Sequence, residues 1–417
     1  MRMVAVLANK EHPELGAISI PIPIRAGEYS SVMKMLSALG IGDVTARDCQ
    51  IEELTRACPT LRKLEGAEVN IDELDYLAKR LDGFDAVEIT QFQAMADKLN
   101  LTEMKDLINL TFSCQQATVI TDFSDLEAVG RNHYMNTHGG SASMEELEHL
   151  DGEESAILLI EGNEGTITRY SVVYDNGMQL SQLYDGRNLP CYHYESDIIS
   201  VGLASRSEPA PPTNIAWVYL PAANEQIERA MHRAGINDPE DISLWMGDSL
   251  FPLEIDVALD FRHEDIYKLN DLAKCVEKLS NNDRVKLGAV VSLAGPKRAE
   301  QVCRLIDNLA LFEFAPGAHT PAEYGRFMIQ KSGHFEYDSN LDEYYDYKRC
   351  GLQQMEYRPR IHRVSWDKKS GGVDGRRFRA DTGGDGNAVD ISPTVWYVVY
   401  LPKERGETHE ATRSKNK

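Results

Sequence analysis

Hydrophobic and polar residues alternate between residues 17 and 24, where isoleucine is interleaved with small residues and proline. This alternation predicts a strand, and its prolines, which cannot donate a ladder hydrogen bond, favour a sheet edge. Val32, Met35 and Leu36 then follow with the three- and four-residue spacing of one helix face. Gly40 is expected to end that helix, because glycine readily adopts the left-handed conformation that follows a helix C-terminus.

A similar pattern returns later in the chain. Residues 215–221 predict a strand, Ile227 and Met231 a helix, and Gly235 the end of that helix. Three short matches at an offset of 195 residues, in the same order, predict a tandem duplication. They pair 40–43 with 235–238, 74–79 with 269–274, and 130–131 with 325–326.

Each repeat is expected to continue with helices that carry clear start signals. Asp85 and Ser280 have the character of N-caps with an acid at the third helical position, and further helices are expected from Asp125 and Thr320. The apolar faces of the preceding helices consist of Leu74, Leu77, Ala78 and Leu81 in the first copy and Leu269, Leu272, Ala273 and Val276 in the second.

Between and after the repeats the pattern favours strands and loops. Strands are predicted at 156–160, 165–174, 179–184 and 395–401, turns at 162–165 and 175–177, a Pro-containing linker at 205–213 and a flexible stretch at 368–387. The prediction is an elongated, multi-domain α+β chain of two tandem repeats, each with small α/β segments flanking a helical segment. Its expected segments are a first repeat at 1–155, a strand-rich connector at 156–210, a second repeat at 211–351 and a basic tail at 352–417.

Charge narrows the range of functions. The formal net charge is −22, with −26 in residues 1–351 and +4 in residues 352–417. An acidic body repels nucleic acid, so direct binding of DNA or RNA by that body is not expected. No apolar run is long enough for a membrane span and no signal-peptide pattern is visible, so a soluble, cytoplasmic protein is expected. The seven scattered cysteines, without a C-x-x-C spacing, agree with a reducing compartment.

Signals for catalysis or metal binding are poor. There is no phosphate loop, nucleophile elbow, dinucleotide fingerprint or H-E-x-x-H motif. His133 and His138 are interpreted as polar loop residues, Cys114 as a buried helix cysteine, and 381–387 as a flexible loop rather than a calcium site. We therefore expect a protein that is not an enzyme and that has no cofactor and no metal.

The remaining chemistry is electrostatic. Carboxylates recur on segments with helix-like patterning, and B-DNA presents one negative charge per ~1.7 Å of its axis. Carboxylates spaced along a rigid protein could imitate that field and occupy the basic channel of a DNA-binding enzyme. The alternative is a solvated acidic surface without a partner. The candidate interface carboxylates are Asp72, Glu73, Asp75, Glu145, Glu146, Glu148, Asp151, Asp338, Asp342, Glu343 and Asp346.

Residues 324–351 resemble the C-terminal antirestriction segment of the ArdA family. That segment has an Ala/Gly-Arg helix that ends in Gly, a spacer, and then Leu-x-x-Tyr-hydrophobic-Asp-Tyr-x-x-x-Gly. The Arg-Asp-Leu that usually follows is replaced here by Leu352-Gln-Gln, and the tyrosines are missing from the first copy at 145–151. The matching positions are Gly325, Arg326, Leu341, Tyr344, Tyr345, Asp346, Tyr347 and Gly351.

Residues 71–95 and 265–291 are similar to the family's central helical part. The chain thus resembles two-copy ArdA-like proteins of conjugative elements in Gram-positive gut bacteria. The resemblance implies a DNA mimic that blocks the groove of type I restriction–modification complexes. Family members dimerise, so a monomeric pseudo-dimer or a homodimer is expected.

Several alternatives remain open. The chain could be an acidic adaptor or regulatory protein of a mobile genetic element without DNA mimicry, or an unrecognised hydrolase that depends on a His or Cys. The tyrosines of the antirestriction-like segment could serve core packing as well as an interface. The tail, which the resemblance does not cover, interleaves basic residues with Tyr357, Trp366 and Phe378. Such a stretch could bind nucleic acid or neutralise part of the acidic body.

Overall fold

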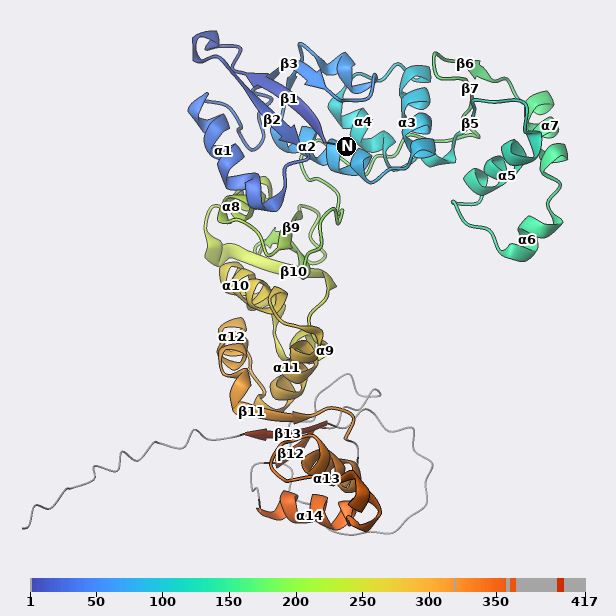
Figure 1. The fold of residues 1–417 in the computed structure, drawn as a ribbon. Coiled ribbons are helices and arrows are strands. Elements are labelled where there is room, and N and C mark those ends of the chain that lie inside the picture. Colours follow the sequence, from blue (N-terminus) through green and yellow to red (C-terminus); the bar gives the residue numbers. More distant parts are fainter. Residues whose placement is uncertain (1, 319, 358–360, 365–395, 401–417) are drawn as a thin grey trace, which may run out of the picture. The chain divides into compact units, whose positions relative to one another are not determined.

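The structure is a computed structural model that describes residues 2–318, 320–357, 361–364 and 396–400 (Figure 1). It has a mixed α+β fold with small sheets and many helices. The chain divides into two compact units. Unit 1 comprises Met1–Asp197 and Val201–Trp245, and unit 2 comprises Ile198–Ser200 and the chain from Met246 onward.

Unit 1 begins with a four-stranded antiparallel sheet in the order β2-β1-β3-β4. Strand β2 (Ala17–Ile22) lies at the edge, as its prolines predicted. Helix α1 (Tyr29–Ala38) packs beside it and ends with Gly40 at φ 66°, which confirms the predicted helix end. The other strands are β1 (Met3–Ala8), β3 (Cys49–Thr55) and β4 (Glu68–Val69).

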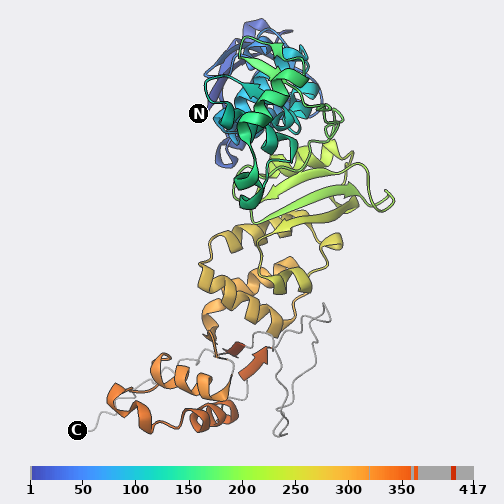
Figure 2. The ribbon, with the colours of Figure 1, turned by 90° about the vertical axis from the view of Figure 1, so that its right-hand side faces the viewer.

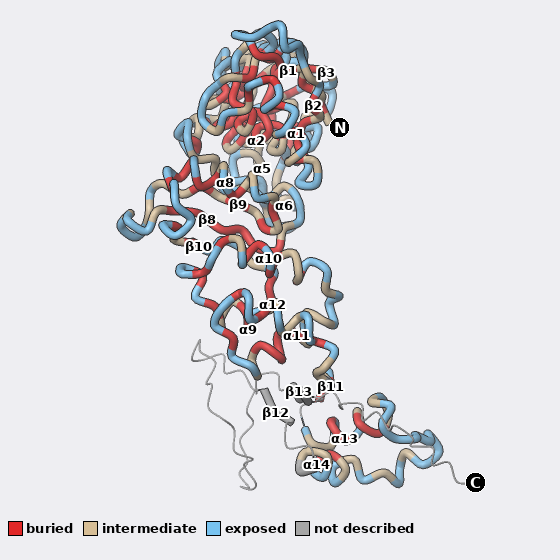
Figure 3. The backbone as a smooth tube through the Cα atoms, turned by 90° about the vertical axis from the view of Figure 1, so that its left-hand side faces the viewer, coloured by how far each residue is buried: buried red, intermediate tan, exposed pale blue. Residues whose placement is uncertain are grey.

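Three helices follow the sheet and complete its core. Asn70 caps α2 and Asp85 caps α3, where Glu88 closes a capping box as predicted. The predicted apolar face of α2 is buried, and Figure 3 shows buried positions around α2. The helices are α2 (Ile71–Asp82), α3 (Ala86–Lys98) and α4 (Met104–Leu110).

A second part of unit 1 combines helices with a small antiparallel sheet in the order β5-β7-β6. Asp125 caps α5, as its sequence predicted, and Val172–Tyr174 forms β7 ahead of the predicted turn at 175–177. The elements are β5 (Thr118–Ile120), α5 (Leu126–Thr137), α6 (Met144–His149), α7 (Gly152–Gly162), β6 (Thr166–Ile167) and β7 (Val172–Tyr174).

Two predicted strands in this region are wrong. Residues 156–160 lie inside α7, where Asp151 caps the helix and Ala156 and Leu159 are buried three positions apart. A short apolar run cannot distinguish a strand from one buried helical face, and here the cap decides. Residues 179–184 form no regular element; Tyr184 is buried and exchanges hydrogen bonds with Asn109.

Unit 1 also holds β9 (Ala216–Leu220) and α8 (Asn224–Arg233), the strand and helix predicted at 215–221 and around Ile227. Gly235 follows α8 at φ 73° and ends it as predicted. Strand β9 is the edge of a three-stranded sheet in the order β10-β8-β9. The other two strands are β8 (Ile199–Ser205) and β10 (Ile242–Ser249).

Unit 2 contains a helical group in which α10 packs on α12 and α11 on α9, the gold helices of Figure 2. The predicted face of α10 is buried, and Ser280 caps α11 as expected. The helices are α9 (Leu253–Ala258), α10 (Ile266–Glu277), α11 (Asn281–Ala294) and α12 (Ala299–Asp307).

The described C-terminal part of unit 2 combines a β11-β13-β12 antiparallel sheet with two helices. Thr320 caps α13 through the predicted capping box, and the strand predicted at 395–401 is β13. The elements are β11 (Phe312–Ala315), α13 (Pro321–Gln330), the 3-10 helix η8 (Ser339–Tyr344), α14 (Tyr347–Tyr357), β12 (Ile361–Val364) and β13 (Trp396–Tyr400).

The observed elements cross two predicted segment boundaries. Position 155/156 lies inside α7 and position 351/352 inside α14, so neither marks an end of a folded segment. The predicted flexible stretch at 368–387 and the candidate calcium loop at 381–387 lie outside the described residues. Within the described chain, none of the helices has the length and apolar character needed to cross a membrane.

Candidate functional site

Residues 324–351 lie within the α13–α14 lobe (residues 320–357), in which two helices cross at glycines. A Cβ atom on Gly325 would lie 1.9 Å from the carbonyl oxygen of Tyr347, and one on Gly351 would lie 1.8 Å from that of Pro321. Any side chain at either position would therefore collide with backbone. The two motif glycines thus have a structural role, because they permit the close approach of α13 and α14.

Two carboxylates of this lobe cap its helices and remain exposed. Asp338 accepts a hydrogen bond from the amide of Asn340 at the start of η8, at 2.9 Å. Asp346 accepts one from the amide of Arg349 in the first turn of α14, also at 2.9 Å. The caps fix the positions of the two charges, and Glu343 adds a third exposed carboxylate.

Asp342 is bound more tightly than its neighbours. Its Oδ1 accepts hydrogen bonds from the hydroxyls of Tyr347 and Tyr337 and from Nε2 of Gln330. The hydrogen bonds from Tyr347 and Tyr337 lower the pKa of Asp342 below its ordinary value. Asp342 therefore organises the lobe from within and has less freedom to meet a partner than Glu343.

Of the three motif tyrosines, Tyr345 and Tyr347 contact other side chains of the lobe, whereas Tyr344 is exposed. The guanidinium of Arg326 lies 4.8 Å from the ring centre of Tyr347, and the rings of Tyr345 and Tyr347 are 5.9 Å apart. Tyr344 is 83% exposed and Leu341 is 48% exposed. The lobe thus presents an aromatic and an aliphatic side chain next to its carboxylates, a combination suited to a protein interface.

Unit 1 contains a similar pair of helices, the α5–α7 lobe (residues 125–162). Here a Cβ on Gly130 would lie 1.8 Å from the carbonyl oxygen of Gly152. Glu145 and Glu148 are exposed on α6, while Glu146 closes a capping box with Ser143. Asp151 is an exposed N-cap that accepts from the amide of Glu154 at 2.9 Å.

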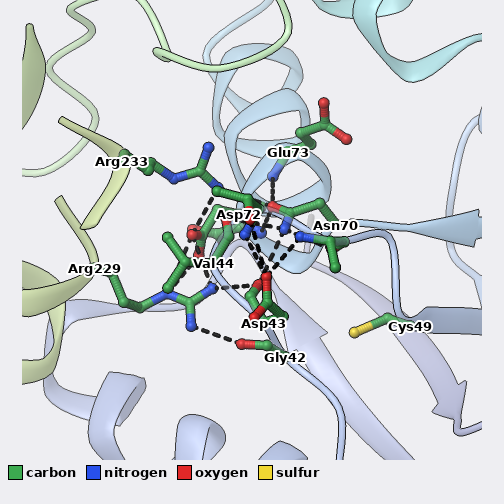
Figure 4. A network of polar contacts seen from close by, with 12 residues as sticks. Gly42, Asp43, Val44, Cys49, Asn70, Asp72, Glu73, Arg229 and Arg233 are labelled. Carbon is green, nitrogen blue, oxygen red and sulfur yellow. Dashed lines mark hydrogen bonds and ion pairs between the residues drawn. The ribbon is translucent and has the colours of Figure 1, made fainter. Parts of the chain in front are cut away.

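Asp72 lies in an internal ion-pair network (Figure 4). Its Oδ2 atom is 2.9 Å from Nη2 of Arg229 and 2.9 Å from Nη2 of Arg233, both on α8. Arg229 also donates to the carbonyl of Gly42, at 2.7 Å, and Arg233 to Oδ1 of Asn70, at 2.9 Å. The side chains of the aspartate and both arginines are at most 14% exposed. The network therefore ties α8 to the start of α2.

Glu73 and Asp75 are also internal. Glu73 is buried and accepts a hydrogen bond from the hydroxyl of Tyr184 at 2.7 Å. Asp75 is buried, accepts from the amide of Ile24 at 2.6 Å and pairs with Lys79 at 2.8 Å. Burial raises the pKa of Asp75. All three α2 carboxylates therefore bind groups within the protein, which leaves the exposed carboxylates elsewhere as the candidate interface.

The catalytic and metal candidates remain weak. His133 lies inside α5, not in a loop, and its Nδ1 is 3.1 Å from the hydroxyl of Thr118; burial lowers its pKa. Cys114 is fully buried, as expected, although in a 3-10 turn (Cys114–Gln116), and burial raises its pKa to about 12. Among the described residues, His, Cys, Asp and Glu form no group of three that could hold a metal ion.

The basic partners of Asp72 were missed by sequence reasoning. Arg229 and Arg233 are four residues apart and so share one face of α8. That spacing was a visible local signal, but their carboxylate lies 157 residues away from Arg229 in the sequence. Comparison with protein-family models, with curated proteins and with solved structures finds no match to this chain.

Proposed function

We propose that this protein is an antirestriction protein that imitates duplex DNA and blocks the DNA-binding groove of a type I restriction–modification complex. The observation that carries the proposal is the set of exposed carboxylates on the α13–α14 lobe, at Asp338, Glu343 and Asp346, within a segment that resembles the ArdA antirestriction segment. The formal net charge of −22 supplies a long-range attraction to a basic groove.

The proposed mechanism is competition for that groove. Asp338 and Asp346 are fixed by backbone hydrogen bonds, so little conformational entropy is lost when they meet a basic partner. Tyr344 and Leu341 add apolar contact that phosphates do not offer. Association should be fast and should weaken as salt rises, because electrostatic complementarity acts mainly on encounter.

A tandem duplication, the finer fold prediction, belongs to the same proposal. Its support is that corresponding helices begin 195 residues apart. The corresponding pairs, by first residue, are Tyr29 and Asn224, Ile71 and Ile266, Ala86 and Asn281, Met104 and Ala299, Leu126 and Pro321, and Gly152 and Tyr347. The glycine crossing at Gly130 and the one at Gly325 have the same offset.

The two proposed copies also meet inside unit 1. The hydroxyl of Ser30 on α1 donates to Oε2 of Glu225 on α8 at 2.9 Å, and these two residues are themselves 195 positions apart. Contacts between a residue and its own counterpart are expected near a two-fold axis. We therefore propose a pseudo-dimer within one chain. A monomeric mass in solution would support it, and an obligate dimer would count against it.

A competition experiment tests the proposed function. The protein is titrated into a type I restriction–modification complex bound to labelled duplex DNA, at low and at moderate salt. We expect displacement that weakens steeply with salt, and about tenfold weaker displacement by the variant D338N/E343Q/D346N. The Asn residues keep the helix caps, so this variant removes charge without removing the caps.

The matched control is Glu277→Gln on α10, which removes an exposed carboxylate outside the lobe and should displace DNA like the parent protein. Equal displacement by the triple variant would contradict the assigned surface. No displacement from several such complexes would contradict antirestriction. A complex that persists with excess DNA and ignores salt would favour an adaptor without mimicry.

A further inference from the structure

A loop in unit 1 places the thiol of Cys191, the imidazole of His193 and the carboxylate of Asp197 in consecutive contact. The Sγ atom of Cys191 lies 3.9 Å from Nε2 of His193, and Nδ1 of the same ring lies 2.9 Å from Oδ1 of Asp197. The thiol thus faces one ring nitrogen while the carboxylate holds the other. This is the arrangement in which a histidine accepts a proton from a nucleophile and a carboxylate fixes the histidine tautomer.

Tyr192 and Tyr194 hold this loop against the rest of unit 1, and so fix the positions of Cys191 and His193. The hydroxyl of Tyr194 donates to Asp82 at 2.6 Å, and the ring of Tyr192 stacks on the guanidinium of Arg80 at 4.4 Å. The amide of Tyr192 donates to the hydroxyl oxygen of Tyr219 at 2.5 Å. Both tyrosines are therefore fixed to folded elements of unit 1, and the residues between and beside them carry the thiol and the imidazole.

Access to solvent differs among the three groups. Cys191 is the exposed cysteine of the seven in the chain; Cys49 and Cys114 are buried and the others are intermediate. The side chain of His193 is 34% exposed and that of Asp197 is 13% exposed. A reagent can therefore reach the sulfur, while the orienting carboxylate is shielded. The ring of His193 is further supported edge-on by Tyr219, at 5.2 Å between ring centres.

We propose that Cys191 is a reactive nucleophilic thiol that forms mixed disulfides with small-molecule disulfides, independently of the antirestriction surface. His193 Nε2 accepts the thiol proton, and the thiolate attacks one sulfur of the disulfide. The S–S bond of the reagent breaks while a new S–S bond forms to Cys191. The leaving thiolate takes the proton from the imidazolium, so one free thiol is released as the Cys191 sulfur is oxidised. Asp197 is the positioning residue.

The sequence contains a local signal for this site. The run Cys191-Tyr-His193 places a thiol and an imidazole two positions apart, with Asp197 four positions further on. Cys114, which the sequence predicted to be buried, is no alternative nucleophile, because burial raises its pKa to about 12.

The test uses the full chain with glutathione disulfide as the probe. The rate at which each cysteine is modified is followed by peptide mass spectrometry from pH 6 to pH 9. An ordinary exposed thiol has a pKa of about 8.5. We expect Cys191 to be modified first, with a pH profile whose midpoint lies below that value. H193Q should slow modification about tenfold at pH 7 and return the midpoint to about 8.5, and D197N should give an intermediate midpoint.

Two controls keep the result interpretable. C191S should abolish the fast reaction, and C350S, which removes a less exposed cysteine, should leave it unchanged. Circular dichroism of each variant checks that the fold is retained, and the pH profile of the parent protein tests the proposal even if a variant fails to fold. A parent midpoint at or above about 8.5, a rate unaffected by H193Q, or faster modification of another cysteine would overturn the proposal.

Discussion

The carboxylates of α2 and those of the α13–α14 lobe look alike in the sequence but differ in the structure. Asp72, Glu73 and Asp75 bind arginines, a tyrosine, a backbone amide and a lysine inside unit 1. Glu343 and Asp346 stay exposed in unit 2. Acidic residues in this chain therefore act in two ways. A buried acid stabilises the fold through a specific partner, whereas an exposed acid contributes to the electrostatic field around the protein surface.

The largest expected effect comes from breaking the internal network. Asp72→Asn removes the charge that faces Arg229 and Arg233, and both guanidinium groups stay largely buried. Removing one partner of a buried ion pair typically costs about 3–5 kcal/mol of unfolding free energy. Urea unfolding, with hydrogen exchange in α2 and α8, measures the loss.

The matched control for that prediction is Glu343→Gln, which removes an exposed carboxylate. It should change the unfolding free energy by less than about 0.5 kcal/mol, as surface substitutions usually do. If both variants lose similar stability, the distinction between internal and exposed acids fails.

The second largest effect tests what holds the exposed acids in place. Gly325→Ala puts a methyl group 1.9 Å from the carbonyl of Tyr347, so α13 and α14 must separate. Overpacking of this kind costs about 1–3 kcal/mol, and a clash with backbone falls at the upper end. Hydrogen exchange within the α13–α14 lobe reports the loss locally, which suits a chain with two units.

Gly162→Ala in α7 is the control for the glycine crossing. No atom lies within 4 Å of a Cβ built there, and alanine favours the helix over glycine. We expect unchanged or slightly higher stability. A loss equal to that of Gly325→Ala would mean that the close approach of the helices is not what makes Gly325→Ala costly, because no such approach exists at Gly162.

Local signals predicted much of the fold. The caps at Asp85, Ser280 and Thr320 depend on residues within three positions of one another, and so do the helix ends at Gly40 and Gly235. These predictions were confirmed because the physics that decides them is contained in one short segment. The strand predicted at 156–160 failed where a five-residue apolar run fits two structures equally well.

The site was less predictable because its residues meet across long sequence separations. Asp72 and Arg229 are 157 residues apart, and Glu73 and Tyr184 are 111 apart. No periodicity reports such a pairing, so nothing in the sequence could separate these acids from Glu343. Only the packing of α8 and of the loop that carries Tyr184 against α2 decides which carboxylates solvent can reach.

The smallest expected change in stability concerns a carboxylate that is neither fully buried, like those of α2, nor exposed, like those of the α13–α14 lobe. Asp256 on α9 is half-buried, and burial, followed by the nearby charge of Glu254, raises its pKa to about 6, although Ser249 donates a hydrogen bond to it. Its unfolded value is about 3.9. Because the folded pKa is the higher one, its stabilising contribution is complete below about pH 4 and is lost as pH rises to about 6.

Asp256→Asn should therefore match the parent protein near pH 4 and exceed it at pH 7.5. The shift alone would correspond to nearly 3 kcal/mol, but solvent screens a half-exposed group, so about 1 kcal/mol is expected. Urea unfolding of unit 2, followed by hydrogen exchange in α9 and α11 at the two pH values, measures the difference. A gain at neither pH value would place Asp256 with the exposed acids, and an equal gain at both would mean that the gain does not come from the titration of Asp256.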